Sequence, residues 1–331
     1  MMKHINVALF TVHEGCPNMC TFCDQRSISG SVKKISADDV HKAAKTALDG
    51  KTDARGGEIA FFGGSFTLIE RGYMLSLLEA AKQHIDSGDF SGIRVSTRPD
   101  GINDEICGIL KQYGVTSVEL GAQSMDDRVL LLNKRGHTAQ DAVNASEMLK
   151  SYGFSLGLQM MTGLYGSTDD DSIETAKKII GLSPDTVRIY PTVVIKGTEL
   201  DRLMKAGEYT PQSVEAAARL GSVLIPMFEE AGVKVIRFGL HSGGGVEGSY
   251  TGGAYHPALR EMAESLIFLD KALKAANGRQ GSAEVYVNPA CVSKMTGQKR
   301  GNIEKLAQAG IRCAVKGDPS LEKNEIRLQF I

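Results

Sequence analysis

The sequence predicts an α/β fold in which helices cover a parallel β-sheet. Over the first 240 residues, short apolar segments alternate with segments of helical spacing, and no hairpin turn joins two neighbouring strands. Strands that are each followed by a helix require right-handed crossovers and therefore a parallel sheet. This pattern fits an open doubly wound sheet or a full or partial barrel, and by itself it does not choose between them.

Six strands are expected, with a candidate for a seventh. They are the apolar runs at residues 5–10, 58–62, 93–97, 116–123, 154–161, 185–194 and, as the seventh, 233–240. Helical spacing occupies residues 35–50, 68–85, 103–114, 138–153, 169–182 and 210–232. Ser36 and Asn103 suit N-caps, and Gly50, Gly114 and Gly153 suit helix ends.

The composition and patterning of the sequence change after residue 241. We therefore expect three parts: a core at 1–241, a loop at 242–257 and a small α/β extension at 258–331. The stretch "SGGGVEGSYTGGAYHP" (242–257) is rich in Gly, Ser and Tyr and is predicted to be a long mobile loop. The extension contains a helical segment at 258–276, a strand at 283–289, a helix around 298–309 and two short strand-like pieces.

The bulk composition is that of an ordinary globular protein. The 331 residues are 42% hydrophobic and 23% charged, with a formal net charge of −1, so no global basic field indicates a nucleic-acid partner. No apolar run approaches the ~20 residues of a membrane span. Six cysteines are too few for a disulfide framework in a chain this long. We therefore expect a cytoplasmic protein with reduced thiols, no membrane partner and an undetermined oligomeric state.

Three of the cysteines crowd into "EGCPNMCTFCDQ", directly after the first strand. Cys16, Cys20 and Cys23 have C-x3-C-x2-C spacing, which allows three thiolates to converge on one metal centre. A structural zinc site wants four ligands, whereas an iron–sulfur cluster held by three cysteines keeps one iron open. Zinc with His13 or Asp24 as the fourth ligand, and chance clustering of structural thiols, stay as alternatives. Cys107, Cys291 and Cys313 lack ligand spacing and are expected to be buried thiols.

The motif "CPNMCTFC" resembles the signature of the radical S-adenosylmethionine (radical SAM) superfamily. The glycine-rich "FFGGSF" (61–66), "STRPD" (96–100), "GAQS" (121–124), "LNKRGHT" (132–138) and "LGLQMMTGLYG" (156–166) follow in the order of that superfamily. The likeness covers residues 5–240 and is greatest to bacterial proteins similar to the Elongator catalytic subunit. It implies a partial (β/α)6 barrel of the TIM type, with the site at the carboxyl ends of the strands.

The resemblance also implies the cofactors and their ligands. Cys16, Cys20 and Cys23 would hold a 4Fe–4S cluster and serve catalysis, because SAM bound to the open iron is cleaved reductively to a 5′-deoxyadenosyl radical. Arg135 would pair with the SAM carboxylate, as a guanidinium does well, and Gln159 would lie at the ribose. The full set of expected cofactor contacts is Phe22, Gly63, Gly64, Ser65, Arg98, Gln123, Arg135 and Gln159.

The substrate is less defined than the initiating chemistry. The resemblance favours hydrogen abstraction from a tRNA base or an RNA-related molecule, with a flavodoxin or ferredoxin as electron donor. The alternatives are a small molecule, porphyrin-like or other, and a non-catalytic scaffold with a structural zinc or cluster. Gln25 stands where the porphyrin branch has a fourth cysteine, and the residues after Leu240 are too few for Elongator's acetyltransferase domain. Groups expected to reach substrate, partly through a closing loop, are Tyr190, Lys196, His241, Tyr250, Tyr255 and His256.

Overall fold

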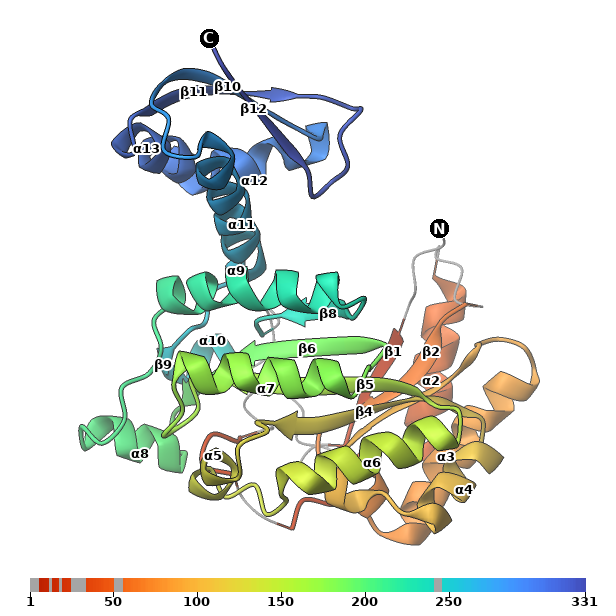
Figure 1. Ribbon diagram of the computed structural model, residues 1–331. Helices are drawn as coiled ribbons and strands as arrows, with labels where there is room; N and C mark the ends of the chain where they lie inside the picture. Colours follow the sequence, from red (N-terminus) through yellow and green to blue (C-terminus); the bar gives the residue numbers. More distant parts are fainter. Residues whose placement is uncertain (1–5, 12–13, 18–19, 25–33, 51–55, 241–245) are drawn as a thin grey trace.

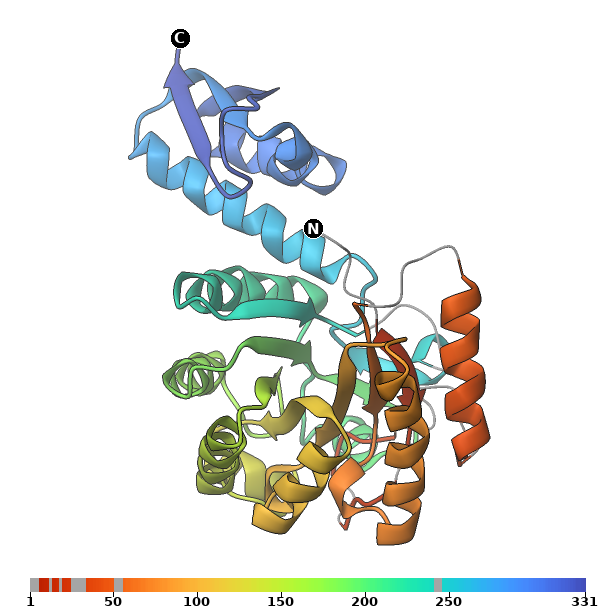
Figure 2. The ribbon, with the colours of Figure 1, turned by 90° about the vertical axis from the view of Figure 1, so that its right-hand side faces the viewer.

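The computed structural model describes residues 6–11, 14–17, 20–24, 34–50, 56–240 and 246–331. Its main body is a sheet of seven strands in the order β1-β2-β3-β4-β5-β6-β8, and each neighbouring pair is parallel. The sheet curls into a half-barrel (Figure 1 and Figure 2). Its strands are β1 (Asn6–Phe10), β2 (Glu58–Phe62), β3 (Gly92–Thr97), β4 (Val115–Gln123), β5 (Ser155–Thr162), β6 (Thr186–Pro191) and β8 (Lys234–Phe238).

The strand order decides between the two architectures that fit the sequence pattern. A doubly wound sheet reverses its strand order at a switch point, whereas here the strands follow the chain from one edge to the other. The partial barrel is therefore confirmed, and the candidate seventh strand is present as β8.

Helices cover the outer face of the sheet (Figure 2). They are α2 (Ala37–Asp49), α3 (Arg71–Asp86), α4 (Asp104–Gln112), α5 (Asp127–Leu132), α6 (Ala139–Ser151), α7 (Asp169–Gly181) and α9 (Val214–Glu230), with 3-10 turns η1 (Phe66–Leu68) and η2 (Pro99–Gly101). Figure 1 shows α8 (Glu199–Lys205) away from this layer. Ser36 and Asn103 cap α2 and α4 as predicted. The helix expected from residue 68 starts only at Arg71, because the Glu70 carboxylate accepts the first free amides of α3.

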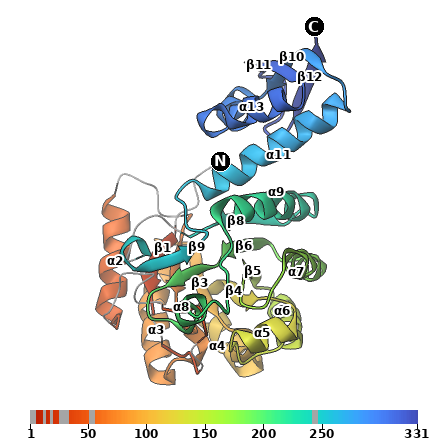
Figure 3. The same cartoon turned by 90° about the vertical axis from the view of Figure 1, so that its left-hand side faces the viewer.

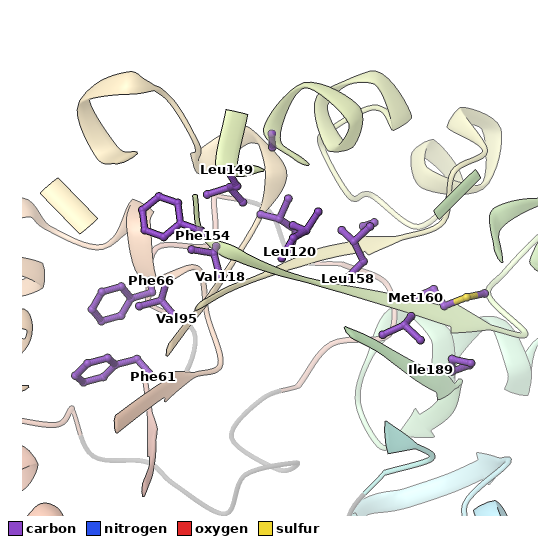
Figure 4. Packing of buried hydrophobic residues seen from close by; sticks show 14 of the residues in the cluster. Phe61, Phe66, Val95, Val118, Leu120, Leu149, Phe154, Leu158, Met160 and Ile189 are labelled. Carbon is purple, nitrogen blue, oxygen red and sulfur yellow. The ribbon is translucent and has the colours of Figure 1, made fainter. Parts of the chain in front are cut away.

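The core lies between the sheet and these helices. Phe61, Val95 and Leu120 alternate along their strands with residues of the other face, and they pack with helical side chains (Figure 4). Phe61 stacks on Phe66 with ring centroids 4.7 Å apart. Leu149 of α6 extends the same cluster. This continuous apolar layer fixes the strand ends on which the site is built.

The inner face of the half-barrel carries a buried ionic network that the sequence did not indicate. Arg94 donates to Glu58 over 2.7 Å and to Glu119 over 3.1 Å. Arg188 donates to both oxygens of Glu119, over 2.7 and 3.0 Å. Four strands are thus joined by charge-assisted bonds, and each buried charge has a partner of opposite sign.

Two predictions about the segment after β6 are wrong. Residues 185–194 form not one strand but two, β6 and β7 (Val193–Ile195), which lie in different sheets. Within the predicted loop 242–257 lie a short helix, α10 (Val246–Ser249), and β9 (Tyr250–Gly253), which pairs antiparallel with β7. A Cβ at Gly253 would lie 2.5 Å from the Thr192 carbonyl oxygen, so this glycine serves a close backbone approach.

The C-terminal extension is a separate α/β unit joined through α11 (Leu259–Ala276). Leu259 and Ala263 belong to the barrel core, whereas Phe268 and Leu269 belong to the core of the extension. Its remaining elements are β10 (Gly281–Val287), η3 (Pro289–Cys291), α12 (Val292–Thr296), η4 (Gln298–Arg300), α13 (Gly301–Gln308), β11 (Ile311–Gly317) and β12 (Ile326–Phe330). The boundary predicted at residue 258 thus falls at the start of a shared helix. Among the described residues, no helix is long and apolar enough to cross a membrane.

Candidate active site

The three clustered cysteines lie on the loop that leaves the carboxyl end of β1. Cys20 is buried, whereas Cys16 and Cys23 are half-buried. The Cys16 Sγ lies 3.5 Å from the hydroxyl of Ser65, which follows β2. The guanidinium of Arg135, beyond β4 and α5, donates to the Cys20 Sγ over 3.1 Å. Two of the thiols therefore touch residues that follow other strands.

The cysteine loop lies against the turn after β2 with backbone touching backbone. The Ser65 amide donates to the Glu14 carbonyl over 2.9 Å. A Cβ at Gly64 would stand 2.3 Å from that carbonyl oxygen and 2.4 Å from the one of Thr11. A Cβ at Gly15 would stand 2.4 Å from the Ser65 carbonyl oxygen. Both glycines also have positive φ, so loop and turn can meet in this way only without side chains at these positions.

The far side of the loop is tied to α5 and α8. The Thr21 hydroxyl donates to the Asn133 side chain over 2.9 Å, and the Leu200 amide donates to the Thr21 carbonyl over 2.8 Å. Phe22 packs against an apolar cluster made by Val194, Leu200, Leu203 and Tyr209. The structure thus gives Phe22 a packing role, and its predicted contact with a cofactor stays a prediction.

Asp201 of α8 continues this support into the β7–β9 pair. Its carboxylate accepts from the Gly197 amide and the Thr251 hydroxyl, each over 2.9 Å, and from the Lys205 ammonium over 2.7 Å. The bond from Lys205, followed by the one from Gly197, lowers the pKa of Asp201 to about 2. Because α8 holds Thr21, the carboxylate connects β9 to the cysteine loop through α8.

We expect Asp201→Asn to loosen the cysteine loop without unfolding the barrel. The amide cannot accept from all three donors as a carboxylate does, so α8 loses its anchor on β9. After anaerobic cluster loading, iron loss to a chelator should be several-fold faster than in the wild type. Asp170→Asn, an exposed change in α7, serves as the control and should leave the rate unchanged. Equal rates for both variants would contradict the support role.

Two guanidinium groups face the thiols with unsatisfied donors. Arg135 also donates to the Gly121 carbonyl over 2.8 Å, and Arg98 forms a two-point pair with Asp100 at 2.8 Å. The Arg135 Nε and the Arg98 Nη1 are buried without a partner among the described residues. Buried donors without partners are costly, so they indicate a site that accepts an anionic or hydrogen-bonding ligand.

The predicted amides come together beside this pair. The Gln159 amide donates to the Gln123 Oε1 over 3.1 Å. Gln123 has φ +65° at the end of β4, where the register with β5 shifts. Its left-handed backbone is strained for a side chain of this size. A Cβ at Gly121 would lie 2.8 Å from the Gln123 amide nitrogen. A glycine here gives the amide room at the strand end.

The donor set suits a cluster held by thiolates. Burial, followed by the charges of Cys20 and Cys16, raises the pKa of the Cys23 thiol to about 12. A thiol held protonated in this way is a poor metal ligand alone, and a bound cation reverses this by favouring the thiolate. Within the described residues, no three His, Cys, Asp or Glu side chains, these cysteines included, form a group that could hold a metal ion, so the fit of a cluster is judged from the chemistry of the donors. With the cationic Arg98 and Arg135 beside them, the three thiols fit an anionic cluster with a carboxylate ligand.

His137 lies buried next to Arg135. Its Nδ1 donates to the Thr138 carbonyl over 3.2 Å, and the buried Nε2 has no partner among the described residues. Burial, followed by the charge of Arg135, lowers the pKa of His137 to about 4. The ring is therefore neutral near pH 7.

We expect His137→Gln to flatten the pH dependence of stability. Between pH 6.5 and 4 the unfolded chain binds a proton at His137 that the folded protein rejects, so wild-type stability falls as pH falls through this window. The loss at pH 4 should reach about 3 kcal/mol. Urea unfolding of the cluster-free proteins at pH 7 and pH 4 measures this loss. The free energy of unfolding of the wild type minus that of the variant should be lower at pH 4 than at pH 7. A difference that does not change between these pH values would contradict a neutral buried ring.

The predicted substrate groups lie on different elements of the fold. Tyr190 lies on β6 and bonds to Arg188. The Lys196 amide donates to the Ser249 carbonyl, and Tyr255 contacts Glu247 and the ring of Tyr250. The His256 Nδ1 accepts from the Ala258 amide over 3.1 Å at the start of α11. His241 lies outside the described residues, as do His13 and Gln25. The substrate roles of these residues stay predictions.

Three residues that position the loop were missed from the sequence. Gly15 directly precedes Cys16, and this adjacency is a signal that could have found it. Asn133 lies within "LNKRGHT", where the arginine gives the stronger signal. Asp201 gives no local signal, because its partners are set by the β7–β9 pairing.

Comparison with known proteins places this arrangement in a family. The sequence profile of the radical SAM superfamily matches residues 10–179, and that of the radical SAM C-terminal domain matches residues 184–267. The chain belongs to the radical SAM superfamily. The radical SAM family uses a 4Fe–4S cluster and SAM, and the chain is an enzyme of this family.

Its relatives are Elongator-like. The tRNA uridine(34) acetyltransferase of Methanocaldococcus infernus is 37% identical over 126 residues, which are 37% of this chain and 24% of that protein. Human Elongator complex protein 3 is 32% identical over 142 residues, 41% of this chain and 26% of that protein. The match with this chain thus spans about a quarter of the length of each of these relatives.

Solved structures show the same fold. The Elp3 of Methanocaldococcus infernus superposes with a TM-score of 0.63 at 22% identity, covering 81% of this chain and 63% of that one. Coproporphyrinogen III oxidase from Escherichia coli gives 0.50 at 16% identity, covering 69% and 52%. At such identities the likeness establishes the half-barrel alone.

Proposed function

We propose that this radical SAM enzyme abstracts a hydrogen atom from a base of tRNA or of an RNA-related molecule. The observation that carries the chemistry is the cysteine loop seated on the Gly64 turn, with Arg135 bonded to Cys20. The choice of an RNA substrate is supported by the relatives, some of which are named tRNA uridine(34) acetyltransferases.

The residues of this chain divide the work by position. Cys16, Cys20 and Cys23 would hold the cluster, and Ser65, whose hydroxyl lies 3.5 Å from the Cys16 Sγ, would offer a polar contact to SAM. Arg135 would orient the SAM carboxylate through a charge-assisted pair. When bound, the cluster and SAM supply a 5′-deoxyadenosyl radical. Gly63, Arg98, Gln123 and Gln159 would complete the SAM site.

The segment that covers the site would exclude water. α8 and β9 lie at the mouth of the half-barrel (Figure 3), and Phe22 packs against Leu200 and Leu203 of α8. A radical needs such cover, because oxygen and thiols dissolved in the solvent would quench it. We propose an external one-electron donor, a flavodoxin or ferredoxin, and expect either one with its reductase to replace dithionite.

A deuterium-transfer experiment tests the substrate class. Reconstituted enzyme receives SAM, dithionite and tRNA prepared from cells grown in deuterated medium. We expect deuterium in the 5′-deoxyadenosine product and a mass change in one nucleoside of the digested tRNA. Formation of 5′-deoxyadenosine that contains no deuterium from this tRNA, together with deuterium uptake from a small-metabolite extract of the same cells, would favour the small-molecule alternative. The absence of any 5′-deoxyadenosine from loaded enzyme would favour the scaffold.

A further inference from the structure

The C-terminal extension differs in charge from the rest of the chain. Residues 277–331 contain nine Lys and Arg against five Asp and Glu, whereas the other residues contain 29 against 34. The family profiles end at residue 267, so this unit has no assigned role. A basic module on an otherwise acidic protein indicates a polyanionic partner.

The extension's sheet has two different faces. Its strands lie in the order β11-β10-β12, and one face packs its apolar residues against α11, α12 and α13. The other face is open, and α11 lies between this sheet and the barrel (Figure 1 and Figure 3). Its side chains are Ser282, Glu284, Tyr286, Arg312, Ala314, Lys316, Arg327 and Gln329. We call this the outer sheet face.

At the centre of the outer sheet face, the ring of Tyr286 lies between two cationic side chains. Tyr286 pairs in register with Lys316 on one side and Arg327 on the other. The Arg327 guanidinium lies 4.6 Å from the Tyr286 ring centroid, and the Lys316 ammonium lies 6.0 Å from it. Tyr286 is half-buried, and both cations are exposed. Rings and guanidinium planes on an open sheet are surfaces on which unpaired bases stack.

Two of the three cations on this face are paired with carboxylates, and the third is available to a phosphate. Glu284 pairs with Lys316 and accepts from the Tyr286 hydroxyl, and Asp318 pairs with Arg327 over 2.8 Å. Arg312 is exposed two positions from Ala314 on the same face, and it has no carboxylate partner among the described residues. Cations that border a stacking surface match the alternation of base and phosphate in a single strand better than they match an acidic protein.

We propose that the outer sheet face binds unpaired RNA. The choice of RNA rests on the proposed function. The face would hold a single-stranded part of the substrate while the reacting base enters the mouth of the barrel. Stacking on Tyr286 and Arg327 supplies contact with a base, and Arg312 and Lys316 contact the backbone.

Fluorescence anisotropy of the full chain with a labelled oligouridine of about twelve nucleotides tests this. We expect Tyr286→Ala to weaken binding about tenfold and Tyr286→Phe to leave it unchanged. Arg312→Gln with Lys316→Gln should weaken binding and lower the slope of log affinity against log salt by about one. Lys274→Gln with Lys305→Gln removes the same charge from α11 and α13 and should have little effect.

Two results would overturn the proposal. One is unchanged affinity in both Tyr286→Ala and the Arg312/Lys316 pair, with melting temperatures that show folded protein. The other is tighter binding of polyglutamate than of RNA, which would assign the face to an acidic protein. The binding assay needs neither SAM nor reductant. If the binding predictions fail while deuterium is still transferred from tRNA, the RNA-binding role of the face is wrong and the proposed function stands. If the binding predictions hold while no deuterium is transferred from tRNA, the proposed function is wrong and the face still binds RNA.

Discussion

Gly64→Ala should expel the cysteine loop and abolish cluster binding. The new methyl group would stand 2.3 and 2.4 Å from two backbone carbonyl oxygens, and neither belongs to a flexible side chain. The loop must therefore move away from the turn after β2, which separates Cys16 from Ser65. Iron bound after anaerobic reconstitution should fall to the background of a Cys20→Ser variant.

Gly88→Ala is the matched control for this change. Gly88 has φ +78°, comparable to the +59° of Gly64, but a Cβ there meets nothing within 4 Å. It should cost about 1 kcal/mol of stability from the left-handed backbone alone and leave iron binding intact. If Gly64→Ala keeps full iron binding, the close approach of loop and turn is not required.

Arg135→Gln should weaken SAM binding by about tenfold to a hundredfold in the iron-loaded enzyme. A charge-assisted bond to a carboxylate contributes about 1.5–3 kcal/mol, and glutamine keeps neither the charge nor the fork. Arg135→Lys should be intermediate, because it keeps the charge without the two parallel donors. Equilibrium dialysis of labelled SAM against variants of equal iron content measures the effect.

Arg128→Gln controls for loss of an arginine nearby. Arg128 lies in α5 and pairs with Asp171 at the surface, where its side chain is 55% exposed. An exposed pair of this kind contributes little, so SAM affinity should not change. Wild-type affinity in Arg135→Gln would show that the carboxylate is held by another group, for which Arg98 is the next candidate.

Most of the barrel could be predicted because its strands are short apolar runs separated by well-signalled helices. Ser36 and Asn103 cap as their sequence context indicates. The segment from β6 to β9 could not be predicted, since the break at Thr192 and the pairing of Gly253 depend on contacts far apart in the chain. Glycine there mimics the composition of a loop.

The site was predictable where chemistry is local and not where it depends on tertiary contacts. Cysteine spacing and the glycine turn are visible in the sequence. The bond from Arg135 to Cys20 spans 115 positions, and the Glu119 network joins strands by charges that no periodicity reveals. Asp201 belongs to the same class, because its role follows from the pairing of β9.

The central claim is that three cysteines hold an iron–sulfur cluster that leaves one iron open to SAM. Anaerobic reconstitution followed by SAM and dithionite tests it most directly. We predict a brown protein with about four irons and four sulfides per chain that forms 5′-deoxyadenosine, and loss of both properties in Cys16→Ser, Cys20→Ser and Cys23→Ser. A colourless protein with stoichiometric zinc and no 5′-deoxyadenosine would contradict it.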